Sequence, residues 1–472
     1  MNSPTAEAPD FRNAIPTADR KGNRIWIYPR QPAGRYHRWR TWVAWLLLAI
    51  LAAGPFIKIN GAPLLMMNFP ERKFILFGQI FWPQDFYIFA LLLLTIFIII
   101  VLSTAAFGRV WCGWMCPQTI FMEMVFRKIE YWIEGDAHQQ RALDAAPWTA
   151  GKAWRKGLKH AIFLALSFGV GNLLLAYIIG VEELWRIVSD DPRNHLVGLS
   201  AMIGFTLLFY GIFARFREQA CTFICPYGRF QSVLLDNNSL VVAYDHRRGN
   251  PQQRFRREQP YEMRKQAGIG DCINCRMCVD VCPTGIDIRN GTQMECVNCT
   301  ACIDACDSVM DRLAFPRGLI RIASQRNIAE GLPFRMTPRL AGYSVILLLL
   351  TGLLGVILFT RANVETQLLR APGSLFQELP GNRIGNLYLV KVVNKTHRDI
   401  PVELRIESPA GAELQVAGGS IQAPRENLAQ SAVVISVPRE QLDHGNAPLE
   451  IGVYEAGKRL RTLKTNLVGP SL

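Results

Sequence analysis

The sequence CINCRMCVDVCP at residues 272–283, followed by CVNCTACIDAC at residues 296–306, decides how the centre of this chain folds. Each stretch has the spacing Cys-x2-Cys-x2-Cys-x3-Cys, which ligates [4Fe–4S] clusters in bacterial ferredoxins, where the fourth cysteine of each run serves the other cluster. Three closely spaced thiolates can surround part of a cubane, and the fourth ligand must come from a distant turn. A zinc site needs only four ligands and would leave the doubled spacing unexplained. We therefore predict two clusters, one held by Cys272, Cys275, Cys278 and Cys306 and the other by Cys282, Cys296, Cys299 and Cys302.

The distribution of cysteine indicates the compartment and the chemistry. All 12 cysteines lie between residues 112 and 306, and the C-terminal region has none. This distribution argues against structural disulfides and for metal or redox chemistry in a reducing compartment. Two adjacent clusters carry single electrons in sequence, so this segment needs an electron donor and an electron acceptor. The sequence does not identify the donor.

Five apolar stretches are long enough to cross a membrane as helices, at residues 41–57, 86–107, 158–181, 196–214 and 340–360. Lysine and arginine are concentrated before the first stretch, between the second and third, and between residues 215 and 339, whereas the loop after the third stretch is acidic. The positive-inside rule therefore places the N-terminus and the cluster segment in the cytoplasm, and the C-terminus on the outer side of the membrane. Because this orientation accounts for the basic loops, the net charge of +14 does not indicate nucleic-acid binding.

These features divide the chain into five parts. Residues 1–35 are a polar tail that we expect to be disordered in the cytoplasm, and residues 36–245 form a membrane domain with helices one to four. Residues 246–335 form the cytoplasmic ferredoxin domain with a basic linker, and residues 336–361 the fifth transmembrane helix. Residues 362–472 contain short strands with alternating apolar residues, as in DIPVELRI at 399–406, which predict a periplasmic immunoglobulin-like sandwich. The predicted fold class is an α-helical membrane protein with an α+β two-cluster ferredoxin domain and a C-terminal all-β sandwich.

Two further cysteine pairs close predicted membrane helices. WCGWMCPQT at residues 111–119 and CTFICPYGR at residues 221–229 place Cys112, Cys116, Cys221 and Cys225 at one membrane surface. The i, i+4 spacing puts each pair on one helical face, and the following proline marks an interruption or restart of the helix. Such thiols could be buried packing residues, could cycle through a disulfide, or could bind Cu(I) as soft ligands. Because the pair is repeated at equivalent positions, we take the four cysteines as hypothetical copper ligands and catalytic thiols.

Haem is not expected. Membrane carriers often hold haem with histidine pairs inside helices, but His37, His160 and His195 lie at or near the ends of predicted helices, with no pair at mid-depth. The predicted cofactors are therefore two [4Fe–4S] clusters, with copper as a hypothetical substrate or bound ion.

The motifs WCGWMCPQT, CTFICPYGRFQ, CINCRMCVDVCPTGIDIR and ECVNCTACIDACDSVM, followed by an outward β-domain, closely resemble those of one known family. This is the FixG, RdxA or CcoG family of cytochrome c oxidase accessory proteins, and the likeness covers nearly the whole chain after residue 35. The resemblance implies a membrane cupric reductase that converts Cu(II) to Cu(I) for the copper centre of a cbb3-type oxidase. It also implies copper chaperones and oxidase subunits as partners. A homodimer is compatible with the sequence, although no residue predicts it.

Two other functions stay open on the sequence alone. A quinol-linked electron carrier resembling NapH also combines such thiol pairs with ferredoxin runs, although the C-terminal sandwich is not expected of it. An assembly scaffold would use the sandwich to bind oxidase subunits or a copper chaperone, and it would not need redox-active clusters. A transporter is not favoured, because no charged residues inside the apolar stretches mark a pathway.

Overall fold

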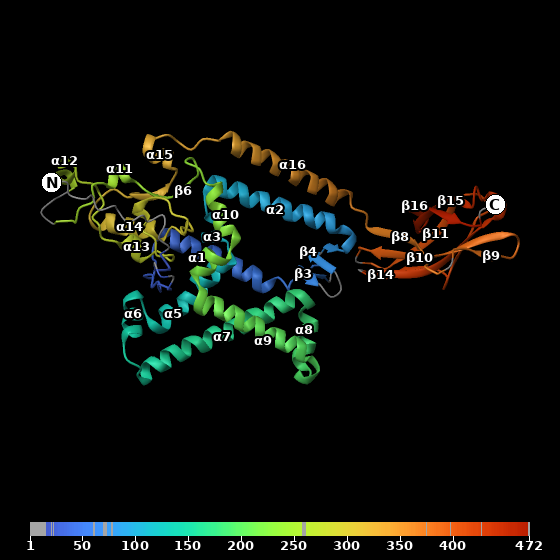
Figure 1. Ribbon diagram of the computed structural model, residues 1–472, viewed down its shortest axis with the longest axis horizontal. Coiled ribbons are helices and arrows are strands. Elements are labelled where there is room, and N and C mark those ends of the chain that lie inside the picture. Colours follow the sequence, from blue (N-terminus) through green and yellow to red (C-terminus); the bar gives the residue numbers. More distant parts are fainter. Residues whose placement is uncertain are drawn as a thin grey trace. The chain divides into compact units, whose positions relative to one another are not determined.

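The computed structural model describes residues 16–19, 21, 23–59, 62–68, 73–76, 79–256, 261–373, 375–396, 398–425 and 427–470. The chain divides into two compact units. The first unit contains residues 1–54 and 89–354, and the second contains residues 55–88 and 355–472. Helices dominate the first unit and strands dominate the second (Figure 1).

Four helices of the described residues are long and apolar enough to cross a membrane. They are α2 (Phe86–Phe107), α7 (Ala150–Ile179), the span Pro192–Phe216 that contains α9 (Leu196–Gly211), and α16 (Pro338–Thr360). These correspond to four of the five predicted stretches. Helix α7 begins earlier than predicted because Thr149 caps it, its hydroxyl accepting a hydrogen bond from the Lys152 amide at 3.3 Å.

The remaining predicted helix is shorter than expected. Helix α1 (Arg35–Ala53) forms where the stretch 41–57 was predicted, but it ends at Ala53, and Gly54 and Pro55, which both disfavour continued helix, follow. The apolar part of α1 has roughly 13 residues and a length of about 20 Å, less than the ~30 Å of a hydrocarbon core. The predicted five helices are therefore four full-length spans and one shorter helix in the described residues.

Short helices connect the spans on the side of the cysteine pairs. After α2 come α3 (Val110–Trp114), α4 (Pro117–Ile120), the π-helix η2 (Phe121–Phe126), α5 (Arg127–Glu134) and α6 (Ala137–Ala145). At its other end α7 leads into α8 (Val181–Ser189) and η3 (Pro192–His195), and α9 is followed by the π-helices η4 (Ile212–Phe216) and η5 (Ala220–Ile224) and by α10 (Pro226–Leu234). π-Helical turns are rare and concentrate at functional sites, and all three of these lie close to a cysteine pair.

The ferredoxin part of the first unit is a small α+β structure. Strands β6 (Val241–Tyr244) and β7 (Ile320–Ala323) pair antiparallel, with α13 (Met277–Asp280) and α14 (Ala301–Arg312) between them in the sequence. The short helices α11 (His246–Gly249), α12 (Tyr261–Gln266), η6 (Ile288–Asn290) and α15 (Gln325–Glu330) complete it. Its core mixes apolar side chains with the buried cysteines of the two runs. Because β6 precedes residue 246, this structure begins before the predicted domain boundary.

The second unit contains the predicted sandwich. One sheet has the order β12 (Glu413–Val416), β14 (Leu428–Pro438), β10 (Arg383–Asn394) and β8 (Val364–Arg370), and β9 (Gln377–Leu379) also pairs with β10. The other sheet has the order β13 (Ile421–Ala423), β11 (Ile400–Ser408), β15 (Asn446–Glu455) and β16 (Lys458–Val468). Alternate residues such as Ile400 and Val402 are buried in the core of the sandwich, as the pattern in DIPVELRI predicted.

Residues 55–88, which lie between α1 and α2, belong to the second unit. They form the pair β1 (Lys58–Ile59) and β2 (Ala62–Pro63), the sheet β3 (Leu65–Asn68), β4 (Lys73–Leu76) and β5 (Gln79–Phe81), and the turn η1 (Pro83–Asp85). The Asp85 carboxylate is buried and accepts hydrogen bonds from Arg361 at 2.6 Å and from Lys395 at 2.7 Å. These ion pairs join the segment to the sandwich although the partners are hundreds of residues apart in the sequence.

The described residues between 16 and 34 differ from the disordered tail expected for residues 1–35. Arg24 pairs with the buried Glu218 at 3.1 Å, and the Trp26 ring lies 4.2 Å from the Arg24 guanidinium and 5.1 Å from that of Arg217. Cation–π contacts of this kind hold an otherwise polar segment against the protein. Residues 1–15 lie outside the described residues, so the expectation of disorder there stays a prediction.

Candidate iron–sulfur and thiol site

Two hollows in the ferredoxin part are lined by the predicted cluster ligands. The first is lined by Cys272, Cys275, Cys278 and Cys306. The second is lined by Cys282, Cys296, Cys299 and Cys302, together with Cys278 from the neighbouring run. Much of the remaining lining is apolar in both. The fold thus groups the eight cysteines as the crossing of each fourth ligand requires.

A repeated backbone turn wraps the chain around each hollow. Asn274 and Arg276 have φ angles of 56° and 59°, and the equivalent Asn298 and Thr300 have φ angles of 52° and 65°. Arg276 directly precedes α13 and Thr300 directly precedes α14. Left-handed residues alternating with other conformations turn successive amide N–H groups toward one side, which produces concave anion-binding backbone. Four thiols, an apolar wall and such a backbone fit an anionic iron–sulfur cluster.

Burial controls the protonation of the cluster cysteines. It raises the pKa of Cys278 and Cys296 to about 12 and that of Cys299 to about 11. Without metal these thiols are therefore protonated at neutral pH, and binding of iron must release their protons.

The four membrane-edge cysteines, Cys112, Cys116, Cys221 and Cys225, form a thiol quartet. Burial raises the pKa of Cys112 to about 11 and of Cys221 to about 12, and negative charge on the other members of the quartet would raise both further. This mutual influence indicates that the four thiols lie in one region of the structure, and their role as a joint copper site stays a prediction. The Gln231 amide also donates a hydrogen bond to Cys112 Sγ at 3.0 Å.

The same turn closes both cysteine pairs. The amides of Cys116 and Cys225 donate hydrogen bonds, both of 2.9 Å, to the carbonyls of Trp111 and Ala220, five residues earlier. Pro117 and Pro226 then begin new helices. The second cysteine of each pair therefore lies at a helix boundary and not on the continuous helical face that the spacing predicted, because proline lacks an amide hydrogen and clashes with the preceding turn.

Within the described residues, no three Cys, His, Asp or Glu side chains lie close enough together to hold a single metal ion. The copper role of the thiol quartet therefore stays a prediction.

The loop that carries Cys296 packs directly on the helix that carries Cys112. A Cβ atom built on Gly113 would lie only 2.3 Å from the Val297 carbonyl oxygen, so the two backbones touch. Trp114 Nε1 donates to the Asn298 carbonyl at 3.2 Å, and the Arg109 guanidinium donates to the Met294 carbonyl. The second hollow and the thiol quartet are therefore adjacent in the fold.

Comparisons with known proteins agree with this arrangement. Family models match at residues 89–135 (4Fe-4S binding domain), 216–325 (4Fe-4S dicluster domain) and 354–470 (IG-like fold at C-terminal of FixG). The nitrogen fixation protein FixG of Rhizobium meliloti is 31% identical over 83% of this chain and 81% of its own length. Protein RdxA of Cereibacter sphaeroides is 33% identical over 84% of this chain and 85% of its own, and its RdxB is 30% identical over 92% and 94%.

The chain belongs to the FixG/RdxA family. It is a membrane iron–sulfur electron-transfer protein, because the dicluster model covers both cysteine runs and the described residues include four helices that could cross a membrane. The crystal structure of a FixG-related protein from Vibrio parahaemolyticus covers 23% of this chain and 98% of its own, with a TM-score of 0.21 and 12% identity, too low a likeness to bear on the fold.

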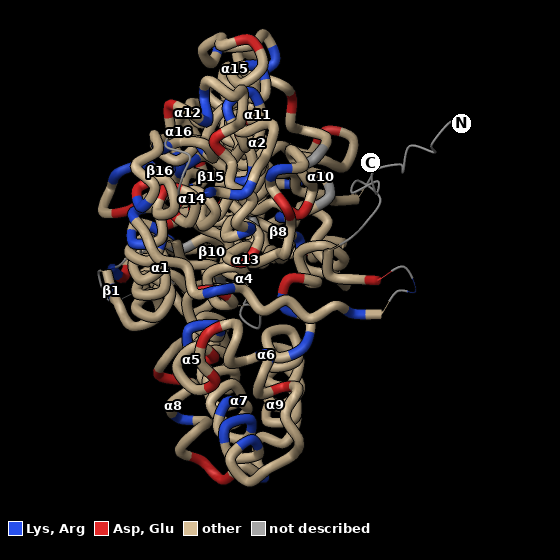
Figure 2. Tube along the Cα trace, turned by 90° about the vertical axis from the view of Figure 1, so that its left-hand side faces the viewer, with Lys and Arg blue, Asp and Glu red and all other residues tan. Residues whose placement is uncertain are grey.

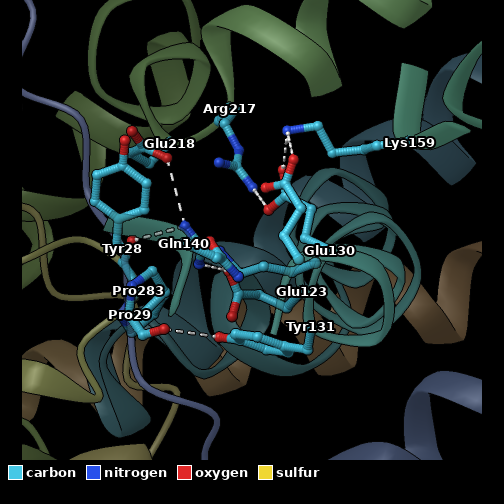
Figure 3. A network of polar contacts seen from close by, with 12 residues as sticks. Tyr28, Pro29, Glu123, Glu130, Tyr131, Gln140, Lys159, Arg217, Glu218 and Pro283 are labelled. Atoms are coloured by element: carbon cyan, nitrogen blue, oxygen red, sulfur yellow. Dashed lines mark hydrogen bonds and ion pairs between the residues drawn. The ribbon is translucent and has the colours of Figure 1, made fainter. Parts of the chain in front are cut away.

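A buried charge network of this FixG-family protein is shown in Figure 3, and two of its members, Glu123 and Glu218, lie within seven residues of Cys116 and Cys221 in the sequence. Its members are Glu123, Arg127, Glu130, Glu134, Lys156, Lys159, Arg217 and Glu218. Arg127 pairs with Glu123 and donates to the Pro283 carbonyl at 3.4 Å, next to the cluster ligand Cys282. Burial alone would raise the pKa of Glu130, but Arg217, Lys159 and Arg127 outweigh it and lower this pKa, so the carboxylate is charged. Both signs of charge are visible on α5 in Figure 2.

Sequence reasoning missed this network, although one signal was present. Glu123, Arg127, Glu130 and Glu134 follow the first cysteine pair at spacings of four, three and four residues, which put them on one helical face. Four charges on one face beside a membrane helix require partners. Those partners come from α7 and from the segment after α9, which no local pattern reveals.

Proposed function

We propose that this protein is a cupric reductase of the bacterial inner membrane. It would pass electrons from its two iron–sulfur centres to Cu(II) at the thiol quartet, and so support assembly of the copper centre of a cbb3-type oxidase. The observation that carries the proposal is the backbone contact between Gly113 and Val297, which joins the quartet to the loop of Cys296. Oxidase subunits and copper chaperones are the partners that the family resemblance predicts.

The chemistry of the quartet supports reduction of copper. When bound, each [4Fe–4S] cluster supplies one electron, and reduction of one Cu(II) consumes one electron. Thiolates are soft ligands that prefer Cu(I), so the quartet stabilises the product over the substrate. Because burial raises the pKa of Cys112 and Cys221, each of these thiols must release a proton when it ligates copper. Gln231 fixes the orientation of the Cys112 sulfur through its hydrogen bond.

The contacts at the two ends of α1 support one orientation in the membrane. The amides of Tyr36 and His37, at the start of α1, donate to the Asp304 carboxylate of the ferredoxin part at 3.1 and 2.7 Å. The residues after α1 belong to the second unit with the sandwich. We therefore propose that α1 crosses the membrane despite its short apolar helix, with Gly54 to Ile57 extending the apolar run. The ferredoxin part would then be cytoplasmic and the sandwich periplasmic.

The test is a single-turnover reduction of copper. Full-length protein, purified anaerobically with both clusters reduced, receives Cu(II) while a chelating dye reports Cu(I) and the cluster absorbance is recorded. A variant with the four quartet cysteines changed to serine runs beside it. We expect the variant to keep reduced clusters and to form Cu(I) at least ten-fold more slowly, because the soft ligands of the product are lost.

The matched control is Trp132→Phe, which changes an exposed side chain on α5 and leaves the four quartet cysteines in place. This variant should reduce copper at the wild-type rate. If the quadruple variant forms Cu(I) as fast as wild type, copper is reduced at the clusters without the quartet, and the proposed site is wrong. If the wild type forms no Cu(I) while its clusters stay reduced, the cupric reductase activity itself is excluded.

A further inference from the structure

We propose that a pocket of the first unit, separate from the two cysteine-lined hollows, binds the headgroup of a membrane quinol, which serves as the electron donor. This inference rests on the proposed function, because it names the donor of the same electron-transfer chain. The pocket has a volume of about 430 Å³, within the range of small-molecule sites. It is lined by Lys156, Lys159 and His160 of α7, by Tyr210 of α9, and by Trp26 and Tyr28 of the N-terminal segment.

The place of the pocket suits a ligand that arrives from the membrane. His160 and Tyr210 belong to two membrane spans, and both lie toward the ends of those spans that are joined to the cysteine-bearing helices. Gly211 and Ala214 also line the pocket, and a Cβ atom added at Gly211 would meet nothing within 4 Å. These small side chains leave open space beside a spanning helix. A ligand that diffuses in the bilayer can therefore enter sideways.

The polar groups of the pocket match a quinol ring. Tyr210 Oη lies 2.9 Å from His160 Nδ1, so the pair offers both a donor and an acceptor for one ring oxygen. Lys156 and Lys159 line the pocket while both are paired with Glu134, and an ammonium group has three N–H donors, so each can still donate to the second ring oxygen. The aromatic rings of Trp26 and Tyr28 supply flat surfaces for stacking.

The pocket is connected to the second cluster hollow by a short series of contacts. The pocket residue Trp26 stacks on Arg24 at 4.2 Å, and Arg24 pairs with Glu218 at 3.1 Å. Glu218 lies 3.6 Å from Arg127, which donates to the Pro283 carbonyl at 3.4 Å. Pro283 follows the cluster ligand Cys282. An electron leaving the pocket thus has a compact, continuous route toward the iron–sulfur centres.

The redox step balances with groups that the chain provides. Oxidation of one quinol breaks its two O–H bonds and releases two protons and two electrons, leaving the quinone. The two electrons match the two one-electron clusters. With His160 Nδ1 protonated toward Tyr210, the Nε2 atom accepts the first proton, and the Asp144 carboxylate, which also lines the pocket, accepts the second.

A larger and more apolar cavity between the opposite ends of α7 and α9 does not serve this role. It is lined by His195 and Asp190, which form a 3.0 Å ion pair. From His195 to Arg215 the chain runs about 30 Å along the span. A quinol bound there would be too far from the clusters to reduce them directly.

Photolabelling tests the site without requiring copper or turnover. Full-length protein in detergent is labelled with an azido-benzoquinone probe that carries a short isoprenoid tail, and the labelled peptides are mapped by mass spectrometry. We expect label on peptides containing Trp26, His160 or Tyr210, and we expect excess ubiquinone-1 to compete with it. Tyr210→Phe should weaken competition about five-fold, since one hydrogen bond to the ring is lost.

The matched control is Tyr177→Phe, which removes a hydroxyl from the other end of α7, where it donates to the Leu51 carbonyl at 2.7 Å. It should label like the wild type. Equal effects of the two variants would overturn the proposal, and so would label that is displaced by phosphatidylglycerol vesicles but not by ubiquinone-1, since the pocket would then bind lipid headgroups. Copper reduction by chemically reduced clusters is measured separately, so its failure is distinguishable from failure of quinone binding.

Discussion

The two units of this protein reach stability in different ways. The sandwich of the second unit has a continuous apolar core in which residues such as Val390, Ile435 and Ile451 are fully buried. The core of the first unit is instead interrupted by two thiol-lined hollows and by a buried charge network. The chain alone fills the apolar core of the sandwich, whereas the thiol-lined hollows of the first unit are filled only when a ligand binds. From this difference we predict that the first unit depends on bound metal centres for its stability and that the second unit does not.

The largest effect is expected from removal of one cluster ligand. Cys299→Ser should lower the iron content from about eight to about four atoms per chain, because the second hollow loses a thiolate. Hydrogen exchange should rise in residues 272–312 and stay unchanged in residues 364–470, as measured by mass spectrometry on the full chain. Cys225→Ser, the control from the thiol quartet, should keep all of the iron. Faster hydrogen exchange in the sandwich of the Cys299→Ser variant would contradict the idea that only the first unit depends on the clusters.

The reverse experiment removes apolar volume from the sandwich. Ile451→Ala should lower the free energy of unfolding of the second unit by about 3 kcal/mol, because a fully buried side chain is replaced by a cavity. The cluster absorbance should not change. Leu389→Ala on β10, where the side chain is 36% exposed, is the matched control and should cost far less. Calorimetry of the full chain measures both, and loss of clusters in Ile451→Ala would contradict the independence of the units.

A buried carboxylate makes the stability of the second unit depend on pH. Burial would raise the pKa of Asp85, but Lys395 and Arg361 outweigh it and lower this pKa below the usual value of 3.8. The stabilisation is therefore present at neutral pH and is lost as the pH falls through the lowered pKa. Asp85→Asn should cost about 2 kcal/mol at pH 7, and the difference from wild type should shrink only below about pH 4.

Thermal melts between pH 3 and pH 7 measure this effect. Glu403→Gln, which removes the partner of Arg405 in a solvent-exposed pair, is the control and should change little at any pH. If the difference in stability between wild type and Asp85→Asn has already disappeared at pH 6, then Arg361 and Lys395 do not hold the Asp85 carboxylate in its charged form.

The smallest effect is expected at the contact between the second hollow and the thiol quartet. Gly113→Ala places a Cβ atom 2.3 Å from the Val297 carbonyl oxygen, so the loop of Cys296 must move away. The rate at which Cu(II) reoxidises the clusters should fall about five-fold, or about 1 kcal/mol in activation free energy. Gly157→Ala, in open space on α7, should leave the rate unchanged. If the two variants have equal rates, the contact between Gly113 and Val297 is not part of the electron route.

Much of the fold was predictable because its signals are local. Cysteine spacing grouped Cys272, Cys275 and Cys278 with Cys306, and the structure lines one hollow with these four. The length of the apolar runs predicted five spans, four of which the described residues contain, and alternation predicted the strands of the sandwich. The prediction for α1 was less accurate, because hydropathy does not register that Gly54 and Pro55 end the helix before the apolar run is complete.

The sequence by itself determined the two ferredoxin cysteine runs, the two repeated thiol pairs and the family to which they belong. Only the tertiary structure decided what surrounds them. Three sets of contacts join residues far apart in the chain: Arg24 and Trp26 with Glu218 and Arg217, Asp85 with Arg361 and Lys395, and Gly113 with Val297. Periodicity and spacing report on neighbours along the chain, whereas ion pairs and backbone contacts between distant segments are fixed by packing.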